Sequence, residues 1–99
     1  MAEPSHVTQV GIIGCGNISS AYVNGCGQFD TLRIAAVADI VPEVAQAKAA
    51  EHGLICAGSV EALLADPDIE IVINLTVPSV HAAVGLAVLE AGKHLYSEK

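Results

Sequence analysis

The chain has 99 residues, which is enough for one compact domain and too few for two. Hydrophobic residues make up 53% of it, yet polar residues or turn signals interrupt every apolar run before the roughly 20 residues that a membrane-crossing helix needs, so neither disorder nor a membrane span is expected. Eleven acidic residues against four Lys and Arg give a net charge of −7, which disfavours nucleic acid as a partner.

The charge and the cysteines narrow the class of protein further. With so few cations, an anionic ligand would have to be held by other groups, such as the backbone amides at a helix N-terminus. Three cysteines, Cys15, Cys26 and Cys56, are odd in number and form no CxxC pair, which is typical of a reduced, cytoplasmic protein. We expect each cysteine to be a small buried hydrophobic residue.

Short β-rich runs alternate with helical segments from the start of the chain. Thr8 to Ile13 is β-branched and stops at a glycine, which predicts a strand. Asn17 to Gly27 follows with apolar residues at helical spacing. Leu32 to Ala38 is nearly continuous in apolar residues, which indicates a strand buried on both faces of a parallel sheet.

The same alternation continues to the end of the sequence. Pro42 to His52 is predicted to be a helix with proline in its first turn, Leu54 to Ala57 a short third strand, and Ser59 to Ala65 a short helix. A fourth strand over Ile69 to Leu75, a helix over Ser79 to Ala91 and a fifth strand over His94 to Ser97 complete the set. Strands separated by helices predict an α/β fold: a doubly wound parallel sheet of about five strands with helices on both faces.

A glycine motif, Gly14-Cys15-Gly16-Asn17-Ile18-Ser19, lies between the first predicted strand and the first helix. In that position the pattern is typical of a Rossmann-type dinucleotide site, because the glycines permit a tight turn and close approach to a diphosphate, and the helix directs its amides at that anion. Ser19 stands where Gly or Ala is usual and is small enough to be tolerated. We therefore assign Gly14, Gly16, Asn17 and Ile18 to cofactor binding, the alternative being a turn in an unrelated α/β domain.

Asp39 ends the second predicted strand, 23 residues beyond Gly16. An acidic residue near this place accepts hydrogen bonds from the adenosine ribose hydroxyls. A phosphate on that ribose would meet the carboxylate, and neither Ile40 nor Val41 supplies a cation. The pattern favours NAD over NADP as the cofactor and places Asp39 and Ile40 at its site.

Thr76, Pro78 and His81 follow the fourth predicted strand, on the edge of the sheet where open α/β folds bind ligands. Thr76 can reach a phosphate or a ribose, Pro78 shapes the start of the helix, and His81 in its first turn faces either the cofactor or solvent. The alternative for Thr76 and Ser79 is that they cap the helix. No pair of histidines has the spacing of metal ligands, so no metal site is expected.

The runs VGIIGCGNIS, EALLADPDIEIVIN, TVPSVH and EAGKHLYSEK resemble the glucose-fructose oxidoreductase and inositol dehydrogenase family (Gfo/Idh/MocA) over about Val7 to Lys99. The most specific part is Ala91-Gly92-Lys93-His94 followed by Glu98-Lys99, which is similar to the family's AGKHV…EKP signature. Members transfer a hydride between a nicotinamide cofactor and a carbon bearing a hydroxyl, mostly on sugars, inositols and related polyols. They join an N-terminal dinucleotide-binding domain to a C-terminal substrate domain.

The resemblance implies roles for the last two residues. Lys99 would be the catalytic lysine of the EKP motif, where its charge can stabilise a developing alkoxide, and Glu98 would contact the nicotinamide end of the site. Ser79 departs from the Asn that many members carry. We expect residues 1–99 to be an incomplete dinucleotide-binding domain of a longer enzyme, able to bind cofactor without turnover and prone to self-association; a non-catalytic dinucleotide-binding or cofactor-sensing module is the alternative.

Overall fold

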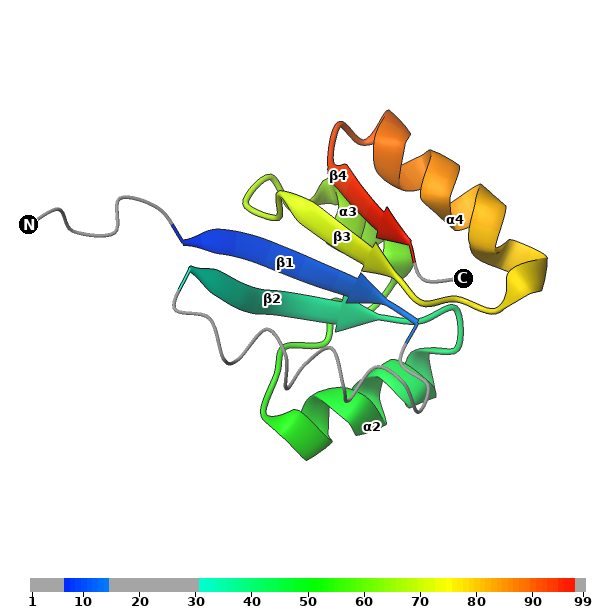
Figure 1. The fold of residues 1–99 in the computed structure, drawn as a ribbon. Coiled ribbons are helices and arrows are strands. Elements are labelled where there is room, and N and C mark those ends of the chain that lie inside the picture. The colour runs from blue at the N-terminus through cyan, green and yellow to red at the C-terminus, as the bar shows by residue number, and fades with distance from the viewer. Residues whose placement is uncertain (1–6, 15–30, 98–99) are drawn as a thin grey trace, which may run out of the picture.

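The computed structural model describes residues 7–14 and 31–97. They form one parallel sheet, whose strands are β1 (Thr8–Ile13), β2 (Leu32–Ala38), β3 (Ile71–Asn74) and β4 (His94–Ser97), in the order β2-β1-β3-β4 (Figure 1). The described helices are α2 (Pro42–His52), α3 (Val60–Ala65) and α4 (Pro78–Glu90). The expected α/β class and parallel sheet are confirmed, whereas the helix predicted over Asn17 to Gly27 lies outside the described residues.

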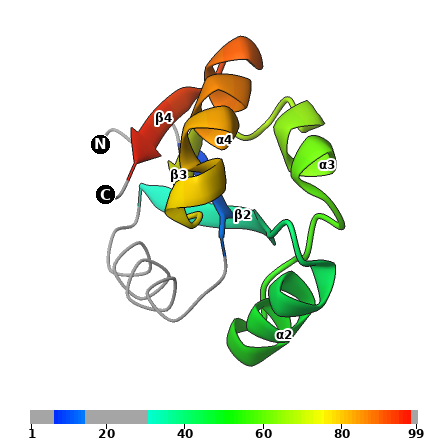
Figure 2. The same cartoon turned by 90° about the vertical axis from the view of Figure 1, so that its right-hand side faces the viewer.

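Helices cover both faces of the sheet. Figure 2, which views the sheet from the side to which the strands point, shows α2 on one face and α3 with α4 on the other. Consecutive strand residues point to opposite faces, so Ile12 packs in the cluster beneath α2 and Ile13 in the cluster beneath α3 and α4. Both side chains are fully buried, which explains why β1 is apolar at neighbouring positions.

The predicted third strand over Leu54 to Ala57 is reduced to a single parallel bridge between Val37 and Cys56. Glycines with positive φ stand on both sides of this segment, Gly53 at 68° and Gly58 at 91°, and turn the chain before and after it. Only one residue is left to pair with β2, through bonds from Val37 N to Ile55 O and from Ala57 N to Val37 O. The prediction of about five strands was therefore too high for the described residues, which form four strands and this bridge.

Other boundaries differ from the predictions by one or two residues. β3 begins at Ile71, after a turn in which the side chain of Asp66 accepts a bond from Asp68 N at 2.9 Å. Helix α3, expected from Ser59, begins at Val60, and Ser59 caps it: its Oγ accepts from Ala62 N at 3.0 Å. No helix in the described part of the chain is both long and apolar enough to cross a membrane.

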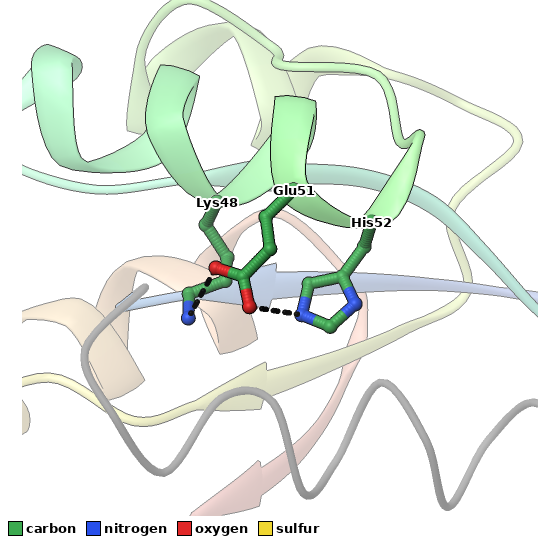
Figure 3. A network of polar contacts seen from close by, with 3 residues as sticks. All are labelled: Lys48, Glu51 and His52. Carbon is green, nitrogen blue, oxygen red and sulfur yellow. Dashed lines mark hydrogen bonds and ion pairs between the residues drawn. The ribbon is translucent and has the colours of Figure 1, made fainter.

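Side chains of α2 form a network of polar contacts near the end of that helix (Figure 3). Glu51 lies between Lys48, at 3.2 Å, and the Nε2 atom of His52, at 3.6 Å. The Glu51 side chain is 58% exposed, so the network contributes little to stability. It lies on a helix surface and has no part in the site described below.

Lys93 is the one charged side chain of the described residues that is buried. Its ammonium group donates to the carbonyl of Asp66 at 2.7 Å and to the carbonyl of Ile69 at 2.8 Å. These carbonyls belong to the loop between α3 and β3, whereas Lys93 lies between α4 and β4. The lysine therefore links the α3–β3 loop to the α4–β4 loop, at the end of the sheet where the strands begin.

The substitution Lys93→Met tests this connection. It leaves two carbonyls without their charged donor, and we expect it to lower the free energy of unfolding by about 2–4 kcal/mol, as measured by urea denaturation. The control Arg33→Met removes the same charge from an exposed position on β2 and should change the free energy by less than about 0.5 kcal/mol. Equal effects of the two substitutions would contradict a structural role for the Lys93 bonds.

Candidate functional site

The strand order reverses at β1, which has β2 on one side and β3 on the other. The chain leaves these three strands at Gly14, Asp39 and Leu75, all at the same edge of the sheet because the strands are parallel. In open α/β folds, ligands bind in the crevice outside the strand ends at this point of reversal. The candidate site is therefore built from the loops after β1, β2 and β3.

Gly14 lies in closer contact with the loop after β3 than any other residue type would permit. A Cβ atom built on Gly14 would lie 2.6 Å from the carbonyl carbon of Leu75 and 2.8 Å from Thr76 N. Its φ of +100° also disfavours every residue with a side chain. Backbone bonds from Gly14 N to Ala38 O and from Leu75 N to Ile13 O hold the three strand ends together.

A small pocket of about 140 Å³ opens where these ends meet. It brings together residues of all three loops, including four that were assigned from the sequence. Its lining is Gly14, Asp39, Ile40, Val44, Leu75, Thr76 and Val77. The expected convergence of Gly14, Asp39, Ile40 and Thr76 on one place is thus present in the structure.

A second pocket of about 210 Å³ lies beside the first and shares Asp39 and Ile40 with it. Pro42 and the residues from Gly58 to Glu61 complete its lining. The charged side chains among these residues are those of Asp39 and Glu61, and both are acidic. Glu61 was not predicted from the sequence, because its place in the same pocket as Asp39 depends on the bridge between α2 and α3.

Asp39 has a fixed orientation at the end of β2. Its Oδ1 atom accepts a hydrogen bond from Val41 N at 2.9 Å, an Asx turn just before α2. The residue is half-buried and lines both pockets. A carboxylate held in this way is a positioned acceptor for hydroxyl groups of a ligand.

His81 lines neither of these pockets and instead contacts the loop that forms the first one. Its Nδ1 atom lies 3.1 Å from the carbonyl oxygen of Thr76. A carbonyl oxygen only accepts, so Nδ1 carries a proton and donates it. His81 therefore stabilises the loop between β3 and α4 through its bond to the Thr76 carbonyl.

Asn74, just before this loop, is a further polar residue that was not predicted from the sequence. It ends β3, is completely buried, and bonds to both Thr76 and His81. The available signal was a lone amide at the end of the apolar run Ile71 to Asn74. Such a buried amide must be paired, and its partners are close in sequence.

The other residues assigned to the site from the sequence either line neither pocket or fall outside the described residues. Pro78 is exposed at the first position of α4 and lines neither pocket. Helix α4 is preceded by Val77 and has no side-chain cap, so the alternative that Thr76 or Ser79 caps it is wrong. Among the described residues no group of His, Cys, Asp and Glu could hold a metal ion. Residues Gly16, Asn17, Ile18, Glu98 and Lys99 lie outside the described part of the chain.

The substitution Gly14→Ala tests the contact between β1 and the loop after β3. The added Cβ meets backbone atoms that cannot rotate away, so we expect a loss of about 3 kcal/mol or more in the free energy of unfolding. Gly53→Ala is the matched control, since Gly53 also has positive φ, at 68°, but has no atom within 4 Å of the built Cβ. It should cost about 1 kcal/mol. Similar losses for both variants in thermal or urea unfolding would show that the contact is unimportant.

Comparison with known proteins agrees with this geometry. Residues 8–99 match the oxidoreductase family with an NAD-binding Rossmann fold, Gfo/Idh/MocA. The whole chain is 35% identical to the inositol 2-dehydrogenase/D-chiro-inositol 3-dehydrogenase of Lactiplantibacillus plantarum and spans 29% of the length of that protein.

Solved structures show the same fold. Myo-inositol dehydrogenase from Lactobacillus casei, in complex with NAD(H) and myo-inositol, superposes with a TM-score of 0.84 at 30% identity, over 94% of this chain and 28% of that one. Biliverdin reductase from Synechocystis, in complex with biliverdin and NADP⁺, has a TM-score of 0.84 at 26% identity, over 93% of this chain and 29% of that one. Both kinds of nicotinamide dinucleotide thus occur among proteins of this fold. The family match covers nearly the entire sequence, and the chain belongs to the Gfo/Idh/MocA oxidoreductase family as part of its NAD-binding Rossmann domain.

Proposed function

We propose that this chain is the dinucleotide-binding part of a dehydrogenase that transfers a hydride between NAD and a hydroxyl-bearing carbon of an inositol, a sugar or a related polyol. The observation that carries the proposal is the pocket where Gly14, Asp39 and Thr76 meet at the reversal of strand order. The inositol dehydrogenases to which the chain is similar support the class of substrate.

The chain's own residues have distinct roles in this proposal. Gly14 permits the close approach of β1 to the loop after β3, and Asp39 accepts hydrogen bonds from the adenosine ribose. Gly16, Asn17 and Ile18 present backbone amides to the diphosphate. Glu98 contacts the nicotinamide end, and Lys99 assists proton transfer at the substrate hydroxyl. The bound dinucleotide supplies the hydride chemistry itself.

The charge of the second pocket supports NAD rather than NADP. Asp39 and Glu61 both line it, and no Lys or Arg is among its lining residues. A phosphate on the adenosine ribose would lie near two carboxylates without a cation to offset them. Asp39 also lines the first pocket, so both cavities would share this preference.

Titration with NADH and NADPH, followed by nicotinamide fluorescence, tests the cofactor assignment. The protein should bind NADH more tightly. Asp39→Ala should weaken NADH binding about 10-fold by removing a charged acceptor, with no matching loss for NADPH. Tighter binding of NADPH than of NADH by the unmodified protein would contradict the preference, and binding of neither would contradict the function.

Glu61→Gln separates the second acidic residue from the first. We expect NADPH affinity to rise about 2- to 5-fold while NADH affinity stays within about 2-fold. The reason is that NADPH alone carries the 2′-phosphate, which the Glu61 carboxylate would repel. Glu43→Gln is the control, since Glu43 is an exposed acidic residue in the first turn of α2 that lines neither pocket. If Glu43→Gln changes NADPH affinity as much as Glu61→Gln does, the effect is one of net charge alone.

Residues 1–99 alone would bind the cofactor without turnover, and a non-catalytic cofactor-sensing module remains the alternative role. Oxidation of an inositol or a sugar by this chain would contradict the first statement. We place the protein in the cytoplasm as part of the same proposal, because three cysteines, an odd number with no CxxC pair, are typical of a reduced chain.

Self-association of the chain is the last part of the proposal. Leu86 and Leu89 on α4 are 58% and 56% exposed, and Tyr96 on the edge strand β4 is 52% exposed. Exposed apolar side chains and an outer strand without a neighbour among the described residues each favour association between copies.

Light scattering at tens of micromolar, about the range of weak to moderate association, should therefore show species larger than a monomer. Leu89→Glu should shift the distribution toward monomer, whereas Ala47→Glu, at an exposed position on α2, should not. A clean monomer for the unmodified chain would contradict self-association.

A further inference from the structure

The amide of Asn74 can adopt only one orientation. Its Nδ2 atom donates to His81 O at 2.9 Å, and its Oδ1 atom accepts from Thr76 N at 3.2 Å. If the amide were turned over, its nitrogen would face an N–H group and its oxygen would face a carbonyl, and both contacts would be repulsive. Asn74 is completely buried, so water cannot relieve such a mismatch.

This orientation fixes the proton of the Thr76 hydroxyl. Asn74 Oδ1 lies 2.6 Å from Thr76 Oγ1 and can only accept, so the hydroxyl donates its single proton to it. The other polar neighbour is His81 Nδ1, at 3.5 Å, which carries its own proton because it donates to the Thr76 carbonyl. Thr76 Oγ1 therefore has lone pairs to offer a ligand and no proton.

The polarity of this hydroxyl decides which part of a dinucleotide it can contact. Phosphate oxygens at neutral pH are acceptors, as Thr76 Oγ1 is, and the two cannot form a hydrogen bond. A ribose hydroxyl can donate to it. Thr76 lines the pocket at the strand ends together with Gly14 and Asp39, where the proposed cofactor would lie.

We propose that Thr76 Oγ1 accepts a hydrogen bond from a ribose hydroxyl of the dinucleotide, and that Asn74 is the positioning residue that sets this polarity. The inference rests on the proposed function and narrows the role of Thr76, for which a phosphate and a ribose were both open from the sequence. It also gives a reason for a buried amide at the end of an apolar strand.

The test compares Thr76→Val with Thr76→Ser on ligands that differ by one hydroxyl. Valine has nearly the shape of threonine and no acceptor, and serine keeps the hydroxyl. The ligands are NAD, its four monodeoxy ribose analogues, and inorganic diphosphate as a competitor. Thr76→Val should weaken NAD binding about 3- to 10-fold, and Thr76→Ser should stay within about 2-fold of the unmodified protein.

Two measurements distinguish loss of this hydrogen bond from a general disturbance of the site: the affinity for the deoxy analogues and the inhibition by diphosphate. The loss caused by Thr76→Val should disappear for one of the four deoxy analogues, because that analogue lacks the donor. Inhibition by diphosphate should be the same in all three proteins. A loss of equal size for NAD and all four analogues, or a weaker effect of diphosphate in Thr76→Val, would overturn the proposal.

Asn74→Ala provides a double-mutant cycle with Thr76→Val. Without Asn74 Oδ1 the threonine hydroxyl is free to turn its proton toward the ligand, so the difference between Thr and Val in binding NAD should shrink. If Asn74→Ala does not fold, the comparison at residue 76 decides alone. Failure of the unmodified protein to bind NAD would remove the proposed function and this inference together, whereas normal NAD binding with no hydroxyl-specific loss would remove only the inference.

Discussion

The close contact of Gly14 with the backbone of Leu75 and Thr76 is the constraint on which the candidate site depends. It joins the end of β1 to the loop after β3 with no side chain between them, at a separation that a single methyl group would violate. The bond from Leu75 N to Ile13 O has its geometry only at that separation. Because Asp39 follows the neighbouring strand, the same contact decides how far Asp39 lies from Thr76 and how wide the pocket between them is.

Two buried polar side chains stabilise the sheet in the same manner, one at the end where its strands begin and one at the end where they finish. Where the strands end, Asn74 bonds to Thr76 N in the loop after β3 and to His81 O in α4. Where the strands begin, Lys93 bonds to two carbonyls of the loop before β3. Each side chain adds hydrogen bonds to backbone groups next to β3, in a place where an unpaired polar group would be costly. The short strand β3 is thus held at both ends by buried side chains, in addition to the backbone bonds that the residue on each side of it makes to β1.

Much of this fold could be predicted from the sequence, because most strands and helices are marked by the composition of their own residues and by turn residues at their ends. Thr8 to Ile13, Leu32 to Ala38 and His94 to Ser97 are apolar or β-branched runs with clear ends, and they match the observed strands. The prediction was wrong where pairing depends on the rest of the molecule: nothing in Leu54 to Ala57 shows that only Cys56 reaches β2.

In the candidate site, too, residues that belong to a local sequence pattern could be predicted, and contacts between distant segments could not. Gly14 and Asp39 carry recognisable patterns, and the structure brings them together. The hydrogen bonds of Asn74, the place of Glu61 beside Asp39 and the buried bonds of Lys93 depend on tertiary packing, for which periodicity gives no signal.

The distribution of cations has a consequence for the rate at which a ligand arrives. Of the cations in the described residues, Lys93 is bonded to carbonyls where the strands begin, Arg33 lies near the start of β2, and Lys48 is paired with Glu51 on α2. None of them lines either pocket at the strand ends, and the chain as a whole carries −7. In the proposed function, a dinucleotide, itself an anion, would approach against the electrostatic field of this domain and would be held by contacts at short range. Added salt screens that field, so the association rate should increase with ionic strength, opposite to the behaviour of sites that attract phosphates with lysine and arginine.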